Sequence, residues 1–191
     1  MKILGIDPGL DRTGWAVLEK GGQGGAARLL ASGLIHTSKS LALEKRLDAI
    51  YDRLVSVIAA NTPCVAAIEE VFFSKRADTQ ANTTHARGVI LLACEKQSLP
   101  ISAYNPREIK KTVSGNGAAD KVQMQKIVQI ILGLKEIPKP DDVADAMAAA
   151  LCHLRLAPLR LAMKNATKRL QIKGNCPGSR FSGSTVGREN I

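Results

Sequence analysis

The sequence predicts an α/β domain in which a mixed five-stranded sheet is flanked by helices. Short apolar segments bounded by turn residues alternate with longer segments of helical periodicity, in the order of three strands, a helix, a strand, a helix, a strand and then further helices. The 191 residues suffice for one domain with a substantial core. Because only one Trp, two Tyr and three Phe are present, Leu, Ile, Val and Ala must build most of that core.

Five segments have the composition of strands, since each is a mainly apolar run bounded by Gly, Pro, Asn or charged residues. The first run stops at Asp7 because Pro8 and Gly9 do not continue strand pairing. The glycine-rich segment 21–25 predicts a hairpin connection between the second and third strands, so the first three strands are expected to form an antiparallel meander. The expected strands cover residues 3–6, 14–19, 27–37, 64–68 and 100–104.

Five further segments predict helices. In the first, apolar residues recur at helical spacing between Leu43 and Ile58, and Asn61 and Pro63 end the helix. Pro106 suits the first position of a short helix. The proline-rich break at 138–140 separates the last two helices. The expected helices cover residues 40–61, 79–99, 106–113, 118–132 and 141–156.

The chain carries a large excess of positive charge, with 27 Lys and Arg against 17 Asp and Glu and a formal net charge of +10. Such a balance indicates a polyanionic partner. Eight basic residues and one acidic residue lie from Arg155 onward, where 160–169 could extend a basic helix and 173–191 has almost nothing to bury. We therefore expect a domain at 1–157 and a basic, disordered tail at 158–191.

The four cysteines are widely spaced and form no CxxC pair. This spacing favours reduced thiols in the cytoplasm over a disulfide framework. No apolar run approaches the roughly 18 residues of a membrane span. Asp7 interrupts the N-terminal apolar run, which does not fit a secretion signal. We expect a soluble cytoplasmic protein with no membrane partner.

Acidic residues occur at the ends of two predicted strands and at the start of the last helix. An Asx-turn explains Asp7 about as well as a functional role does. Asp141 directly follows Pro140 and is expected to be the helix N-cap, which favours Asp142 as the partner of Asp145, although helical geometry alone does not choose between Asp141 and Asp142. The acidic residues are Asp7, Glu69, Glu70, Asp141, Asp142 and Asp145.

Carboxylates in these positions suit hard divalent cations bound through oxygen, so Mg²⁺ or Mn²⁺ is favoured over zinc. Close carboxylates repel one another unless a cation neutralises them. Two such ions can activate a water and stabilise the leaving oxygen in phosphodiester cleavage, while basic residues hold the phosphate backbone. We assign no metal or base role to His36, His85 or His153, and we expect Trp15 in the core.

Five blocks of the sequence stand out by their order and spacing: LGIDPGLDRTGWAV, AIEEVFFSKRADT, HARGV, REIKKTVSGNGAADK and DDVADAMAAALCH. Together they resemble the RuvC family of bacterial Holliday-junction resolvases, and the resemblance covers residues 1 to about 156. It implies a ribonuclease-H-like fold, a homodimer with its contact in the helix at 79–99, and Mg²⁺-dependent crossover junction endonuclease activity on four-way DNA junctions. It also implies two ions per subunit, replaceable by Mn²⁺, and the RuvA and RuvB branch-migration complex as a partner.

The resemblance also assigns roles to individual residues. The four metal-binding and catalytic carboxylates of the family fall on Asp7, Glu69, Asp142 and Asp145. Lys121 joins them as a catalytic residue that stabilises developing charge, and Lys110 and Lys121 match positions next to the scissile phosphate. Phe72 matches an aromatic residue that stacks on or wedges between bases at the crossover. The full expected DNA-binding set is Phe72, Lys75, Arg76, Arg87, Lys110 and Lys121.

Three alternatives remain open on the sequence. The related YqgF group shares the fold and has been linked to RNA processing, but its chains are not expected to combine the Phe72 loop with both lysines. An ATPase of the actin and sugar-kinase type also begins with an apolar strand and Asp-x-Gly, but it needs two such domains. A junction-binding protein without catalysis is disfavoured because all four candidate acids are present.

Overall fold

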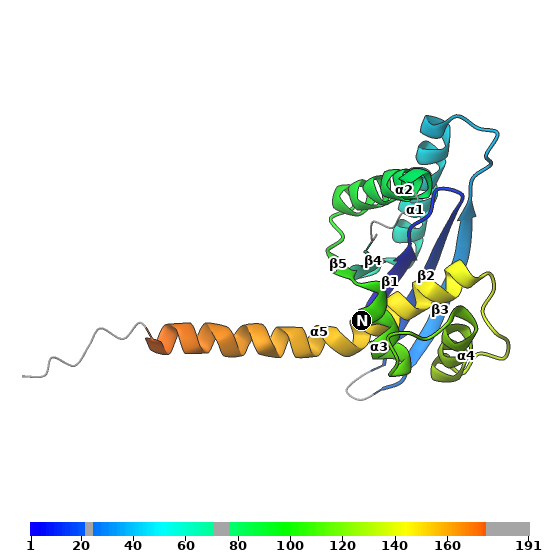
Figure 1. Ribbon diagram of the computed structural model, residues 1–191. Coiled ribbons are helices and arrows are strands. Elements are labelled where there is room, and N and C mark those ends of the chain that lie inside the picture. Colours follow the sequence, from blue (N-terminus) through cyan, green and yellow to red (C-terminus); the bar gives the residue numbers. More distant parts are fainter. Residues whose placement is uncertain (22–24, 71–76, 175–191) are drawn as a thin grey trace, which may run out of the picture. The chain divides into compact units, whose positions relative to one another are not determined.

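The computed structural model of the protein describes residues 1–21, 25–70 and 77–174, with only the backbone described for 77–80 and 159–174. Its contacts divide the chain into a unit Met1–Ala157 and a unit Pro158–Ile191. The first unit contains the whole sheet (Figure 1). None of the helices in the described part of the chain has the length and apolar character of a membrane span. The strands are β1 Lys2–Asp7, β2 Arg12–Lys20, β3 Ala27–His36, β4 Val65–Glu69 and β5 Ile101–Tyr104.

The sheet has the strand order β3-β2-β1-β4-β5, with β1 at its centre. Strands β1, β2 and β3 pair antiparallel, which confirms the predicted meander. Strand β4 pairs parallel to β1 on one side and to β5 on the other. The mixed five-stranded sheet predicted from the sequence is therefore confirmed. The carboxyl ends of its parallel strands β1, β4 and β5 lie at the same edge of the sheet.

Five helices accompany the sheet, each close to a predicted segment. Asn105 accepts a hydrogen bond from the backbone N–H of Arg107 (2.8 Å) and caps α3, with Pro106 in the first turn as predicted. Asp120 and Gln123 form a capping box at the start of α4. The helices are α1 Leu43–Asn61, α2 Ala77–Lys96, α3 Pro106–Ser114, α4 Lys121–Leu132 and α5 Asp141–Gly174.

The last helix is longer than predicted, because α5 continues past Leu156 to Gly174 with Pro158 inside it. A proline inside a helix removes one hydrogen bond, but the residues that follow it are mostly strong helix formers such as Leu, Ala, Lys and Arg. The helical extension that the sequence allowed over 160–169 is present, and the helix also includes 158–159 and 170–174, which were expected to belong to a disordered tail. Residues 175–191 lie outside the described residues, and so does the prediction made for them.

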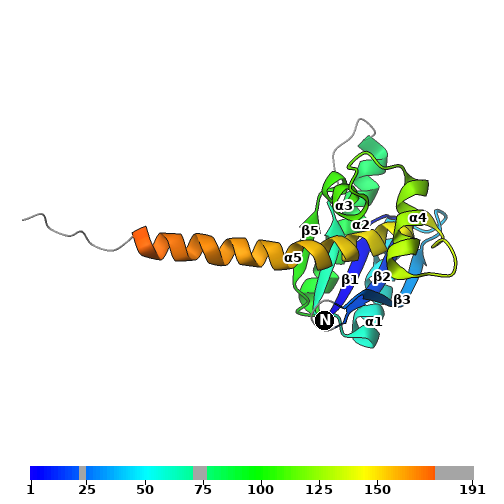
Figure 2. The same cartoon turned by 90° about the horizontal axis from the view of Figure 1, so that it is seen from below.

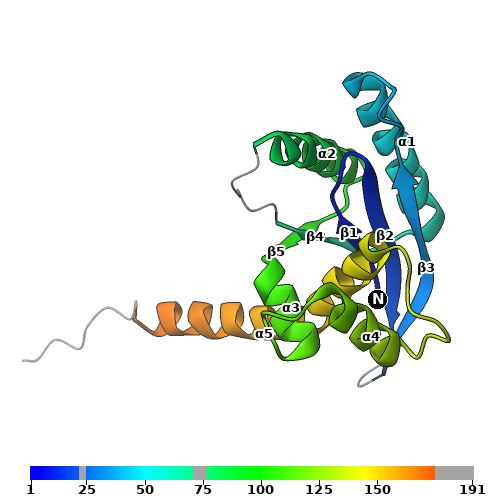
Figure 3. The ribbon, with the colours of Figure 1, turned by 45° about the vertical axis from the view of Figure 1, so that its right-hand side comes forward.

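Two hydrophobic clusters cover the two faces of the sheet. Ile3 of β1 packs with residues of α3, α4 and α5, whereas its neighbours Leu4 and Ile6 pack with residues of α1 and α2. This alternation follows from the strand geometry, in which successive side chains point to opposite faces. Figure 3 shows α1 and α2 on one side of the sheet and α3 and α4 on the other, and Figure 2 shows the first part of α5 crossing β1.

Helix α5 lies directly against the backbone of β1 and β2. A Cβ atom added at Gly5 would lie 1.9 Å from the carbonyl oxygen of Ala146, and one added at Gly14 would lie 2.0 Å from the carbonyl oxygen of Asp142. Only glycine permits so close an approach. Since Gly14 pairs with Asp7 in the β1–β2 register, the first turn of α5 is held beside the end of β1.

Two residues to which the sequence assigned no functional role, His153 and Trp15, contribute to packing. His153 is buried, and its Nδ1 lies 2.8 Å from the hydroxyl oxygen of Tyr104, with the two rings edge to face. Trp15 is only half-buried, because it packs across β3 at Gly33 on the rim of the core rather than inside it. None of the described cysteines forms a disulfide.

Candidate active site

Two carboxylates lie side by side at the edge where the parallel strands end. Strand β1 ends at Asp7 and strand β4 ends at Glu69. The parallel register pairs Ile6 with Ile68, so Asp7 and Glu69, the last residues of the two strands, stand at the same level. The sequence predicted acids at two strand ends, and the β1–β4 register brings those ends together.

A third carboxylate reaches the same place from α5. Asp145 lines a pocket of about 290 Å³ together with Asp7 and Glu69, and Lys110 of α3 and Lys121 of α4 also line it. We call this the carboxylate pocket. Asp145 lies on α5, and the residues from Val143 to Leu154 around it are almost all buried. Its carboxylate therefore lies beside the sheet edge rather than on an open solvent face.

Burial and like charges raise the carboxyl pKa values in this pocket. Burial raises the pKa of Asp7 well above its usual value, and the charges of Glu69, Asp145 and Asp142 raise it further. The pKa of Glu69 rises to about 7, mainly through burial and then through Asp145. Burial also raises the pKa of Asp145. The lysines at the rim do not offset this repulsion, so added positive charge in the pocket is favourable.

Asp142 occupies a different position from the other three acids. It lines a neighbouring pocket of about 490 Å³, and its Oδ2 lies 3.1 Å from Nε of Arg12. That contact lacks hydrogen-bond geometry, and Oδ2 is buried with no hydrogen-bond partner. The charge of Asp142 nevertheless acts on Asp7, so it belongs to the same electrostatic group.

The donor set of these four acids fits a hard divalent cation. Within the described residues, no three His, Cys, Asp or Glu side chains are close enough together to define a metal position. The acids supply only carboxylate oxygens, one of them buried and unsatisfied, in a region of excess negative charge. Oxygen-only sites of this kind suit Mg²⁺ or Mn²⁺ rather than zinc.

Asp141 does not have the capping role predicted for it. Helix α5 begins at Asp141 itself, and the carboxylate accepts a hydrogen bond from Lys121 Nζ (2.6 Å). Its other oxygen lies 3.5 Å from Nη2 of Arg12. The bond to Lys121 lowers the pKa of Asp141 and raises that of Lys121. The capping argument for choosing Asp142 was therefore wrong, although Asp142 and not Asp141 is the one whose charge acts on Asp7.

The other predicted DNA contacts fall into three groups. Lys110 is half-buried in the carboxylate pocket, and its charge opposes the rise in the pKa of Glu69. Arg87 lies on α2 away from that pocket, half-buried, with its Nε buried and without a hydrogen-bond partner. Phe72, Lys75 and Arg76 lie outside the described residues.

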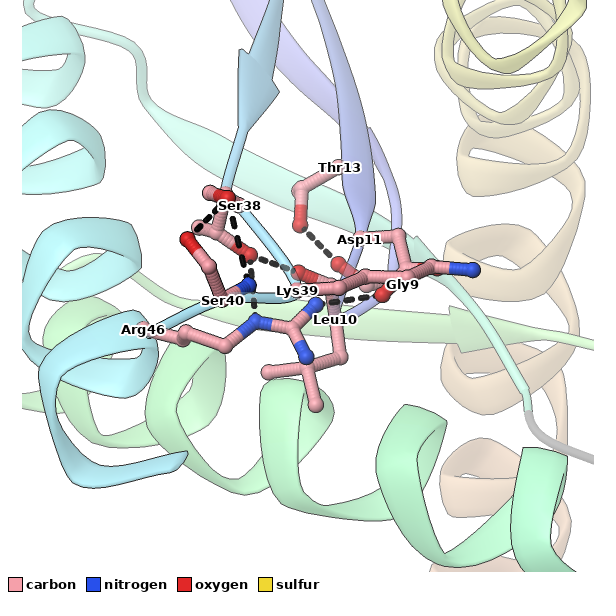
Figure 4. A network of polar contacts seen from close by, with 9 residues as sticks. Gly9, Leu10, Asp11, Thr13, Ser38, Lys39, Ser40 and Arg46 are labelled. Carbon is pink, nitrogen blue, oxygen red and sulfur yellow. Dashed lines mark hydrogen bonds and ion pairs between the residues drawn. The ribbon is translucent and has the colours of Figure 1, made fainter. Parts of the chain in front are cut away.

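A polar network that was not predicted from the sequence lies on the β1–β2 connection (Figure 4). Arg46 of α1 is buried, bonds Asp11 through Nη2 and donates through Nε to Oγ1 of Thr37 (2.9 Å). Lys39 pairs with the second oxygen of Asp11 at 3.1 Å. The signal was present in the sequence, because Arg46 continues the buried stripe of α1 one turn before Ile50.

The family model of the crossover junction endodeoxyribonuclease RuvC matches residues 3–153. The chain belongs to this family. A RuvC from Caldicellulosiruptor saccharolyticus is 47% identical over 154 residues, which are 81% of this chain and 92% of the relative. A RuvC from Chloroflexus aggregans is 43% identical over 158 residues, which are 83% of this chain and 95% of the relative.

Solved RuvC structures share the fold. The structure of Thermus thermophilus RuvC superposes with a TM-score of 0.77 at 35% identity and covers 83% of this chain and 96% of its own. The same protein in complex with a Holliday junction substrate gives the same values. The predicted ribonuclease-H-like fold and the predicted membership of the RuvC family are both confirmed. The RuvC match spans every residue of the carboxylate pocket, together with Arg12, Asp141 and Asp142.

Proposed function

We propose that this protein is a homodimeric, Mg²⁺-dependent endonuclease that resolves four-way DNA junctions in recombination and repair by paired, symmetric nicks. Its RuvC relatives are named crossover junction endodeoxyribonucleases, and the Thermus relative was solved with a Holliday junction substrate. The observation that carries the proposal is the carboxylate pocket, in which acids from β1, β4 and α5 meet beside two lysines. Excess negative charge surrounded by positive charge suits metal-assisted cleavage of a phosphate backbone.

In this proposal Asp7, Glu69, Asp142 and Asp145 hold two Mg²⁺ ions, and Mn²⁺ can replace them. Bound ions of this kind supply Lewis acidity and an activated water for phosphodiester hydrolysis. The contribution of the chain is a rigid frame. Three of the acids lie where the ends of two strands and the first turns of a tightly packed helix fix the backbone.

The two lysines act on the phosphate in this proposal. Lys110 and Lys121 line the pocket from α3 and α4, opposite the strands that carry Asp7 and Glu69. A cation beside the scissile phosphate orients it and stabilises the negative charge that develops on its oxygens. Lys121 is the better placed for the second role, because the bond to Asp141 fixes its ammonium group.

The remaining parts of the proposal concern partners. A C2 dimer presents two identical sites to the two opposed strands of a junction with approximate two-fold symmetry, and the helical segment 79–99 supplies the contact. Phe72 stacks on an unpaired base at the crossover, and Lys75, Arg76 and Arg87 contact phosphates. The basic residues of 158–191 add affinity for DNA, and a RuvA–RuvB motor loads the enzyme in the cytoplasm.

The test compares three labelled substrates: a four-way junction, a linear duplex and a structured RNA. Each is incubated with the purified protein in Mg²⁺, in Mn²⁺ and in EDTA. We expect symmetric nicks in the junction alone, with either metal and not with EDTA. Cleavage of the RNA in preference to the junction, or junction cleavage in EDTA, would contradict the proposal.

A further inference from the structure

Asp141 lies between two cations that come from other parts of the fold. Its Oδ2 accepts the hydrogen bond from Lys121 Nζ at 2.6 Å, and its Oδ1 lies 3.5 Å from Nη2 of Arg12. Lys121 is the first residue of α4, and Arg12 is the first residue of β2. One carboxylate thus joins the starts of three elements, α4, β2 and α5.

The start of α4 has its cap from other residues, and the cationic partners of Asp141 lie outside α5. Helix α4 has its own capping box from Asp120 and Gln123. Helix α5 begins at Asp141, whose carboxylate bonds Lys121 and Arg12 instead of capping its own helix. An acid in the first turn also suits the helix dipole, but that effect is worth only about 0.3–1 kcal/mol.

The bond changes what Lys121 can do. Its side chain is about two-thirds exposed, and a free lysine of this kind samples many rotamers. The bond to Asp141 restrains the ammonium group at the mouth of the carboxylate pocket, which Lys121 also lines. An ammonium group has three N–H donors, so one can bond Asp141 while two remain for a phosphate.

Arg12 connects the same carboxylate to a second acid of the site. Its Nε lies 3.1 Å from Oδ2 of Asp142, so Arg12 is shared between Asp141 and Asp142. The charge of Asp141 therefore offsets the hold of Arg12 on Asp142 as well as restraining Lys121. Both effects act on groups that touch the carboxylate pocket or its neighbour.

We propose that Asp141 is a positioning residue for the cleavage reaction, which holds Lys121 at the scissile phosphate and shares Arg12 with Asp142. The inference rests on the proposed function, because it requires that Lys121 acts on a bound phosphate. Asp141 itself touches neither substrate nor metal.

The first test replaces Asp141 with Asn or Ser, which suit helix starts as well as Asp does but carry no charge. We expect Asp141→Asn and Asp141→Ser to lower the single-turnover cleavage rate by about 10- to 100-fold, the size expected for misplacing a catalytic group. Junction affinity in EDTA should stay within about twofold, since non-reacting phosphate contacts dominate it. Asp141→Glu should recover part of the rate. Unchanged cleavage in both uncharged variants would overturn the inference.

The matched control is Asp120→Asn. Asp120 precedes Lys121 and is also exposed and acidic, but its side chain bonds Gln123 N (2.8 Å), and it is not among the charges that act on Lys121. Asn caps a helix as well as Asp does, so we expect cleavage within about twofold of the parent rate. A loss equal to that of Asp141→Asn would reduce the effect to general surface charge and overturn the inference.

A double-mutant cycle separates positioning from a merely structural role. Because Asp141 acts mainly through Lys121, adding Asp141→Asn to Lys121→Met should change the single-turnover rate by less than about threefold, which is the part carried by Arg12. A full additional loss in that background would overturn the inference. The proposed function is judged separately, because it fails if Asp7→Asn still cleaves junctions. An inactive Asp7→Asn with fully active Asp141 variants would leave the proposed function standing and remove only the role of Asp141.

Discussion

Asp7 and Asp11 are four residues apart in the chain and have opposite electrostatic environments. Asp11 bonds Arg46, pairs with Lys39 and has a lowered pKa because of those bonds. Asp7 is half-buried near three other acids, and its pKa is raised well above the usual value. Asp11 therefore has cationic partners within the fold, whereas Asp7 lies among other acids.

The contrast separates a structural charge from a functional one. Asp11 fixes the β1–β2 connection against α1 through its bond to Arg46. If Asp11 is removed, the buried guanidinium group of Arg46 loses a hydrogen-bond partner, which costs free energy of folding. The carboxylate pocket concentrates repulsion that contributes nothing to folding. Such an arrangement is sustained only where the fold holds it rigidly and a ligand relieves it, which is the property of a metal site.

The largest expected effect is on cleavage. We expect Asp7→Asn to lower single-turnover cleavage in Mg²⁺ by about 10³-fold or more, because the proposed function makes Asp7 a ligand of the metal ions. Junction binding in EDTA should persist, since it depends on phosphate contacts. Asp11→Asn is the matched control, and its folded fraction should cleave at the parent rate. Equal losses in the two variants would erase the distinction between the two acids.

The second prediction concerns how α5 is held at the site. Gly14→Ala places a methyl group against the carbonyl of Asp142, so we expect the free energy of unfolding to fall by about 3 kcal/mol. Denaturant unfolding measures this change. Gly88→Ala is the control, because Gly88 lies in helix α2 with open space around its Cβ position and should gain about 0.5–1 kcal/mol. Equal stability of Gly14→Ala and the parent would contradict the close contact.

The third prediction concerns pH. The pKa of Glu69 is raised to about 7, so its proton is held more tightly in the folded state than in the unfolded state. The stability that this proton provides is full below the unfolded pKa of about 4.3 and is lost as pH rises through 7. We expect metal-free protein to lose roughly 2–3 kcal/mol between pH 5 and pH 8, by the usual linkage between pKa and stability.

Added Mg²⁺ should restore that stability at pH 8, because the folded state alone binds it. The variant Glu69→Gln removes the titrating group, and its metal-free stability should change less with pH over the same range. Chemical unfolding at each pH, with Mg²⁺ or EDTA, provides the measurement. A metal-free protein whose stability rises steadily from pH 5 to pH 8 would show that the pocket does not store this repulsion.

The smallest of the expected losses in stability is that from removing the carboxylate of Asp11. We expect Asp11→Ala to lower the free energy of unfolding by about 1 kcal/mol, a value kept small because Asp11 is itself partly exposed. The pKa of Asp11 is lowered, so its contribution is present above the unfolded pKa and is lost as pH falls through the folded pKa, the opposite direction to that of Glu69. Glu19→Gln, which breaks an exposed pair with Arg28, should leave the melting temperature unchanged.

Local patterns were enough to predict most of the strands and helices and the position of two acids at strand ends. The apolar runs that end at Asp7 and Glu69 define strands, and parallel strands end at one edge of a sheet. In the last helix, Val143, Met147 and Leu151 recur every four residues, which indicates one buried face, and all three are buried. These features depend on residues near one another in the chain, and so the sequence predicts them.

The features that were missed depend on tertiary contacts. Asp141 resembles an N-cap in its local sequence, but Lys121 and Arg12 approach it from other elements and take up both of its oxygens. Arg46 continues the buried stripe of α1, but the sequence does not show that Asp11 and Thr37 are its partners. Local sequence does not specify which distant group completes such a contact.

The most direct test of the account is to locate the metal. Crystals of the protein grown at pH 8 are soaked in Mn²⁺, and anomalous diffraction records the positions of the ions. We predict two Mn²⁺ ions per subunit within reach of the carboxylates of Asp7, Glu69, Asp142 and Asp145, and neither of them in Asp7→Asn crystals. A protein that cleaves junctions in the same Mn²⁺ solution while its crystals hold no ion in the carboxylate pocket would contradict the account.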